Sequence, residues 1–119
     1  ENIVIEQIEG GFIQGLGWLT CEELCFSQEG KLLTTGPSTY KLPGSRDVPP
    51  IFNVKLLENA DNDEKTIFRS KAVGEPPLLL AISHFLALKE AIKASLPSSK
   101  AELLNSPATP SEILKAIYA

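Results

Sequence analysis

Gln7-Ile-Glu-Gly-Gly-Phe-Ile-Gln-Gly-Leu-Gly17 is a glycine-rich run that begins a predicted helix over 7–23. The apolar residues of this helix follow one another at steps of four, four and three, which places them on one face: Ile8, Phe12, Leu16 and Leu19. Glycines at positions 10, 11, 15 and 17 lie inside the helix. Each glycine costs a helix about 1 kcal/mol relative to alanine. We therefore expect packing, rather than helix propensity, to hold this segment.

A second face of the same helix combines glycines with amide side chains. Its members are Gln7, Gly11, Gln14, Gly15 and Trp18. A surface without side chains lets another body approach the backbone, and the amides can donate and accept hydrogen bonds there. The alternative is that the glycines only allow tight packing against a neighbouring element, and the residues alone favour this alternative.

Farther along the chain, the pattern predicts strands first and helices later. A hairpin is expected over 24–40, an ordered loop over 43–50, and single strands over 52–57 and 66–73. Helical spacing then returns from two prolines at 76–77 through Ile92, and a last helix over 111–117 follows the capping-box sequence Thr109-Pro-Ser-Glu112. The predicted fold class is α+β, with mixed helices and a small, mostly antiparallel sheet in a single unit, 1–119.

The composition is that of an ordinary folded chain: 43% of the residues are apolar, 22% are charged, and the net charge is −4. No basic patch indicates a nucleic-acid partner. The most apolar run, 78–88, is too short to span a membrane. Cys21 and Cys25 are too few for a disulfide framework or a zinc site, so free cytosolic thiols are expected. The chain enters its first motif without a starting Met, which indicates a fragment.

Lys71-Ala-Val-Gly-Glu75-Pro-Pro77 places one carboxylate where a predicted strand meets a helix that should be buried in its first half. The helix N-terminus favours the ionised carboxylate, whereas burial among residues 78–80 favours the neutral acid, so a base with a pKa near neutral can result. The alternative is an acid that only complements the helix dipole, and physical chemistry alone favours it. The single histidine, His84, is expected to be a packed core residue.

Three blocks of this sequence resemble the xanthine dehydrogenase and aldehyde oxidase family of molybdenum hydroxylases, in the C-terminal part of the molybdopterin-binding domain. They are the stretches 7–17, 36–43 (Gly-Pro-Ser-Thr-Tyr-Lys-Leu-Pro) and 70–78, and the turn 105–110 extends the resemblance over nearly the whole chain. The Glu-Pro-Pro form of the third block is similar to xanthine dehydrogenases. The sequence at 22–24 and 53–57 looks most like that of the separate molybdenum subunit of bacterial enzymes.

The resemblance implies an oxidoreductase that hydroxylates purines with water as the oxygen source. Glu75 then acts as the general base on the molybdenum-bound hydroxyl. Gln7 contacts the molybdopterin, and the backbone of Lys71, Val73 and Gly74 lies against it. No residue of the chain is expected to bind a metal directly. The resemblance also implies a cytoplasmic location, iron–sulfur clusters and FAD in other domains or subunits, the rest of the molybdenum subunit as a partner, and an oligomer.

Several family elements are absent from this sequence, including a second glutamate, an arginine and the phenylalanines that sandwich the purine. The isolated chain is therefore expected to bind no cofactor tightly, to turn over no purine, and to self-associate through the face from Gln7 to Trp18. Two alternatives stay open. One is a non-catalytic interaction module of the same fold, and the other is an aldehyde-oxidising relative.

Overall fold

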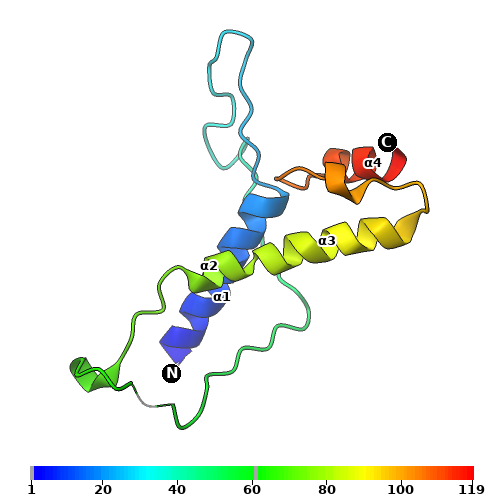
Figure 1. Cartoon of the computed structure of the whole chain (residues 1–119). Coiled ribbons are helices and arrows are strands. Elements are labelled where there is room, and N and C mark those ends of the chain that lie inside the picture. The colour runs from blue at the N-terminus through cyan, green and yellow to red at the C-terminus, as the bar shows by residue number, and fades with distance from the viewer. Residues whose placement is uncertain (1, 61) are drawn as a thin grey trace.

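A computed structural model describes residues 2–60 and 62–119, and the elements in these ranges are helical (Figure 1). The α-helices are α1 (Asn2–Thr20), α2 (Pro76–Leu80), α3 (Ile82–Ser95) and α4 (Pro110–Tyr118), and the 3₁₀ turns are η1 (Ile67–Arg69) and η2 (Ala101–Leu103). The predicted first and last helices are confirmed, although α1 begins at Asn2 and ends at Thr20 rather than spanning 7–23.

The predicted α+β class is wrong, because the described residues contain no strand. The expected hairpin over 24–40 keeps only one isolated antiparallel bridge, between Phe26 and Leu32. It forms an arm that projects away from the helices (Figure 1). A two-stranded hairpin with no third strand and no helix packed on it is only marginally stable. Phe26 is 58% exposed, so the arm lacks the buried face that would extend its pairing.

The segment predicted as a strand over 52–57 runs extended along α1 without forming a ladder. Phe52, Val54 and Leu56 are half-buried and alternate with exposed residues, and the Phe52 ring lies 5.4 Å from the ring of Phe12 between centroids. No backbone hydrogen bond joins residues 48–60 to any other described residue. The alternation that predicted a strand is therefore real, but a sheet also needs a second strand to pair with.

The strand predicted over 66–73 is interrupted by η1. Phe68 (φ 50°) and Arg69 (φ 53°) both adopt left-handed backbone conformations there, which an extended strand does not allow. The chain turns at this point and reaches α2 as an irregular connection (Figure 1).

Glycines of α1 allow that helix to touch α2 directly. A Cβ atom added at Gly11 would lie 3.1 Å from Cβ of Pro77, and one at Gly15 would lie 2.8 Å from Cβ of Ala81 and still closer to the carbonyl oxygen of Leu78. The packing alternative is thus confirmed for these two glycines.

The apolar core of the described residues lies at the C-terminal end, where α3, η2 and α4 meet. Its buried members are Ile92, Ala101, Leu104, Ala108 and Ala116. The hydroxyl oxygen of Thr109 accepts a hydrogen bond from the backbone N–H of Glu112 at 3.4 Å and so caps α4, as the capping-box sequence predicted.

The expected helix from 76 to 92 is two helices that meet at Ala81, and its first half is less buried than predicted. Leu79 and Leu80 are 55% and 60% exposed, whereas Ile92 in the second half is 3% exposed. The first half is apolar all round, but α1 covers only one side of it.

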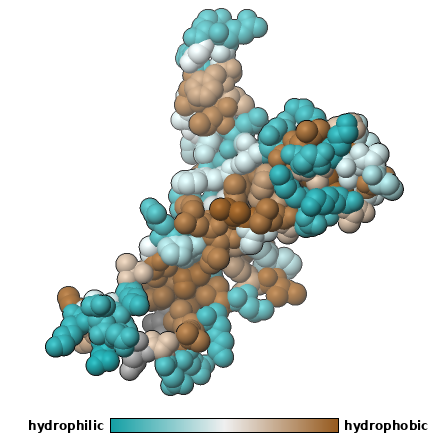
Figure 2. All heavy atoms as spheres, in the orientation of Figure 1, coloured by the Kyte–Doolittle hydropathy of each residue, from teal (hydrophilic) through white to brown (hydrophobic). Residues whose placement is uncertain are grey.

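The chain is open for its length. Its radius of gyration is 18.1 Å, with extents of 53 × 39 × 26 Å, whereas a compact chain of 119 residues would have a radius of about 13 to 14 Å. Apolar side chains gather on the surface over the middle of the molecule (Figure 2). No helix within the described ranges is both long and apolar enough to cross a membrane. Large apolar surfaces therefore stay uncovered within this chain.

Candidate functional site

A cavity of about 320 Å³ lies between α1 and the turn that leads into α2. It brings together Gln7, Val73, Gly74 and Glu75, although more than sixty positions separate Gln7 from the other three. The complete lining is Glu6, Gln7, Gly10, Gly11, Gln14, Val73, Gly74, Glu75 and Leu78. Four of the five predicted site residues therefore share one cavity.

The fifth predicted residue, Lys71, lines a neighbouring cavity of about 310 Å³. Val73 contributes to both cavities, so the two adjoin. The segment from Lys71 to Glu75 thus borders two cavities beside α1.

Local backbone chemistry presents Glu75 to this cavity. Gly74 has a φ of 63°, a conformation that glycine adopts without the steric cost that other residues incur. Two prolines follow and start α2, where their missing N–H groups lose no hydrogen bond. Glu75 occupies the N-cap position, yet its side chain makes no capping hydrogen bond. The carboxylate is therefore free to act on whatever enters the cavity.

The predicted burial of Glu75 among residues 78–80 is wrong for this chain. Glu75 is exposed, as are Leu79 and Leu80, because nothing in the described residues covers that side of α2.

Unused hydrogen-bonding groups face the same region. The peptide groups of residues 71–74 make no hydrogen bond with any described residue. At Gly10 an added Cβ would meet nothing within 4 Å, so the helix backbone is bare there. The cavity is lined by bare backbone, two amides and two carboxylates. The amides and the peptide groups suit a flat heterocycle that carries many donors and acceptors.

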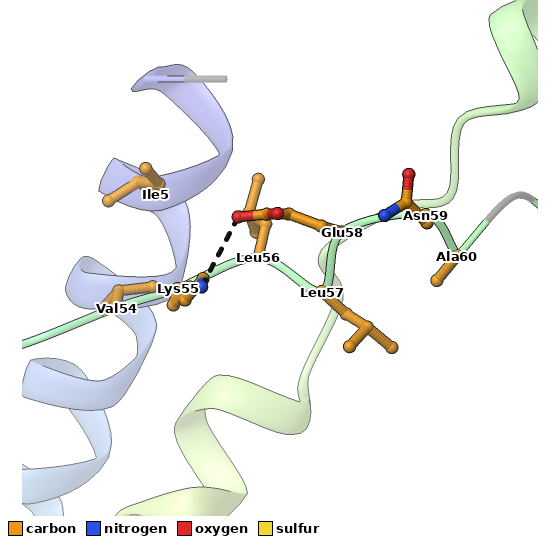
Figure 3. A pocket seen from close by; sticks show the side chains of 8 residues that line it. All are labelled: Ile5, Val54, Lys55, Leu56, Leu57, Glu58, Asn59 and Ala60. Carbon is orange, nitrogen blue, oxygen red and sulfur yellow. Dashed lines mark ion pairs between the residues drawn. The ribbon is translucent and has the colours of Figure 1, made fainter.

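A larger cavity, of about 610 Å³, has other chemistry. It is formed by Ile5 of α1 and the extended segment 54–60 (Figure 3). Its one ion pair joins Lys55 Nζ to Glu58 Oε1 at 3.4 Å. Because it contains none of the predicted site residues and its charged side chains are largely exposed, we do not treat it as the functional site.

Histidine and cysteine side chains lie away from the Glu75 cavity. Half-buried His84 and Cys21 line a separate cavity of about 540 Å³ between α1, the loop around Asp47, α3 and α4. Cys21 and Cys25 are both free, as predicted. No cluster of three or more His, Cys, Asp or Glu residues that could hold a metal ion occurs in the described part of the chain.

Sequence reasoning missed one residue of the Glu75 cavity and left another without a role. Glu6 was not considered, and Gln14 was only a member of the glycine face. Both line the cavity. The signal was available, because Glu6, Gly10 and Gln14 follow at steps of four and so share a stripe of the helix.

Comparison with known proteins shows which family this chain belongs to. Residues 1–49 match the model of a family described as the molybdopterin cofactor-binding domain. The chain is 52% identical over 120 residues to the xanthine dehydrogenase/oxidase of Felis catus, and the match covers 96% of this chain and 9% of that protein. It is 48% identical over 129 residues to xanthine dehydrogenase 2 of Arabidopsis thaliana, covering 98% of this chain and 9% of that protein.

The N-terminal part of this chain is thus a segment of a molybdopterin cofactor-binding domain. Taken with the relatives, the chain belongs to the xanthine dehydrogenase family. It spans about 9% of the length of these relatives. The finer likeness to the molybdenum subunit of bacterial enzymes stays a prediction.

Proposed function

We propose that this chain forms one wall of the molybdenum site of a xanthine dehydrogenase, an oxidoreductase that hydroxylates purines with oxygen from water. The observation that carries the proposal is the single cavity lined by Gln7, Val73, Gly74 and Glu75. The names of the relatives support xanthine as a substrate, and the family model supports molybdopterin as the cofactor.

The cofactor would lie against one side of this cavity. Gln7 offers a carboxamide, and the segment 71–74 offers peptide groups that have no partner among the described residues. Such groups match the donors and acceptors of a pterin, and Gly74 lets it approach the backbone closely. When bound, the cofactor supplies a molybdenum centre that accepts two electrons from the substrate and delivers oxygen derived from water.

Glu75 would be the general base of this reaction. Its carboxylate has no capping bond and opens onto the same cavity, so it can accept a proton as the new carbon–oxygen bond forms. A positioned base typically accelerates such a step by about 10² to 10⁴-fold. The exposure of Glu75 in this chain fits a site that further sequence closes.

The remaining parts of the enzyme would come from other sequence. Electrons would leave through iron–sulfur clusters and FAD in other domains or subunits, and the rest of the molybdenum subunit would cover α1 and α2. The exposed apolar residues support such a cover, among them Trp18 (49% exposed) and Leu80 (60%). A cytoplasmic location and an oligomeric enzyme belong to the same proposal.

Replacing Glu75 by Gln in the full-length protein tests the base. The change keeps size and hydrogen bonding but removes the proton acceptor, so kcat for xanthine should fall by about 10² to 10⁴-fold or more. Molybdenum content by elemental analysis and the thermal midpoint should stay unchanged.

Glu102→Gln is the matched control, because Glu102 is an exposed carboxylate in η2, at the C-terminal end of the chain. It should leave kcat unchanged. Near-normal turnover by a fully loaded Glu75→Gln enzyme would remove Glu75 from the mechanism and leave it as a helix-terminal acid, worth at most about 1 kcal/mol of stability.

A further inference from the structure

Gln14 lines the Glu75 cavity, yet neither the resemblance nor the base mechanism gives it a role. We infer that Gln14 is a substrate-binding residue that hydrogen-bonds the polar edge of the purine, on the side of Glu75 opposite the cofactor wall. This inference rests on the proposed function, since it assigns the far end of the same site.

The position of Gln14 on α1 sets it apart from Gln7. The two are seven positions apart, which is about two helical turns and about 10 Å along the axis. Both amides line the same cavity, and the helix surface between them is bare at Gly10. The two amides are therefore too far apart to bind the same small group, and a flat ligand can lie against the helix between them.

Contacts between α1 and α2 determine which end of the cavity lies next to Gln7 and which lies next to Gln14. Gly11 lies against Pro77, and one turn farther Gly15 lies against Leu78 and Ala81, so the two segments run in the same sense past each other. Gln7 precedes this contact on α1, as Val73 and Gly74 precede it on the other segment. Gln14 and Leu78 lie within the contact, where Gly15 meets Leu78. Along the second segment Glu75 follows Val73 and Gly74 and precedes Leu78, so it lies between the part of the cavity next to Gln7 and the part next to Gln14.

The chemistry of Gln14 suits a purine. A carboxamide donates and accepts at once, which matches the adjacent N–H and C=O groups of an oxidised purine ring in a bidentate pair. The Gln14 side chain is exposed and makes no hydrogen bond with any described residue, so both functions are available. Leu78, half-buried beside it, offers an apolar contact to the ring.

Binding without turnover is the measurement that isolates this role. In the full-length protein carrying Glu75→Gln, which binds but does not hydroxylate, Gln14→Leu should raise the Kd of xanthine about tenfold by calorimetry, because a good bidentate pair is lost. Gln14→Asn, polar but too short, should also raise it. In the presence of Glu75 the same changes should raise KM and leave kcat nearly constant.

Gln28→Leu is the matched control, because Gln28 is an exposed amide in the turn of the projecting arm. It should leave the Kd unchanged. Molybdenum content should be normal in every variant.

Two results would overturn the inference. An unchanged Kd in Gln14→Leu would mean that Gln14 does not touch substrate, and a loss of molybdenum with an unaltered Kd would assign it to the cofactor wall. Neither result affects the proposed function, which fails instead if the parent protein holds no molybdenum or oxidises no purine.

Discussion

The two ends of this molecule pack in opposite ways. At the C-terminal end, α3, η2 and α4 bury a continuous apolar cluster around Ile92 and Ala116, which are 3% and 0% exposed. At the cavity end, α1 meets α2 through glycine backbone, while Leu79 and Leu80 point away and stay exposed. Buried apolar side chains stabilise the first end. At the second end the two helices approach closely because glycines leave no side chain between them.

This difference separates stability from function along the chain. A cluster of buried side chains gains free energy in proportion to the apolar area it removes from water, and it needs nothing outside itself. A glycine contact gains little area, but it brings two backbones and their polar neighbours close together. The cavity that carries Gln7 and Glu75 is found where the second kind of packing occurs.

The largest expected effect would come from breaking the C-terminal cluster. Ile92→Ala removes a buried side chain and leaves a cavity, so the free energy of unfolding should fall by about 2 to 5 kcal/mol in urea denaturation. Leu114→Ala is the matched control on α4, where Leu114 is 54% exposed, and it should change stability by less than about 0.5 kcal/mol. Equal effects of the two changes would show that the cluster is not the core in solution.

Alanine substitutions at two glycines of α1, one inside the contact with α2 and one outside it, should change the stability of the chain in opposite directions. Gly15→Ala places a methyl group against Ala81 and the Leu78 carbonyl, so overpacking of about 1 to 3 kcal/mol should exceed the helix-propensity gain of about 1 kcal/mol and destabilise the chain. Gly10→Ala meets nothing within 4 Å and should stabilise it by up to about 1 kcal/mol. Thermal midpoints measure both, and stabilisation by Gly15→Ala would refute the close approach of α1 and α2.

The smallest expected effect concerns the link between α1 and the projecting arm. Tyr40 Oη donates a hydrogen bond of 2.6 Å to Glu22 Oε2, and this bond raises the pKa of the tyrosine hydroxyl. The unfolded chain therefore releases the Tyr40 proton at lower pH than the folded chain does, so this stabilisation is complete below the ordinary tyrosine pKa of about 10 and is lost as pH rises above it.

Urea midpoints measured between about pH 9 and about pH 11 should show this loss in the wild type and lack it in Tyr40→Phe. Tyr118→Phe, which changes a tyrosine that is 74% exposed at the end of α4, should keep the wild-type profile. A pH profile unchanged by Tyr40→Phe would mean that the bond does not form in solution.

Local signals in the sequence predicted the helical parts well. The apolar spacing of Ile8, Phe12 and Leu16 gave α1, and Thr109 with Glu112 gave the start of α4, because helix spacing and capping depend on residues within a few positions. The prediction of a sheet was wrong because strand pairing depends on residues that are distant in sequence. Residues 52–57 alternate as a strand does, but a strand becomes a sheet only through a partner distant in sequence, and no local pattern supplies one.

The site shows the same limit. The residues alone favoured packing for the glycine face and a dipole role for Glu75, and only the resemblance connected Gln7 with Glu75. Spacing could not do so, because more than sixty residues lie between them and their meeting depends on how α1 and α2 pack. The burial expected around Glu75 was wrong as well, since none of the described residues covers that side of α2.

The unpaired backbone of residues 48–60 has a consequence for handling the chain in concentrated solution. Free N–H and C=O groups along an extended, alternating segment form a template on which another extended chain can add, which is how exposed edges cause aggregation. Lys55 lies in the middle of this segment with its side chain exposed, and a lysine on an edge disfavours such addition because it would bring like charges together. Lys55, which does not line the cavity of Glu75, therefore disfavours aggregation through this segment.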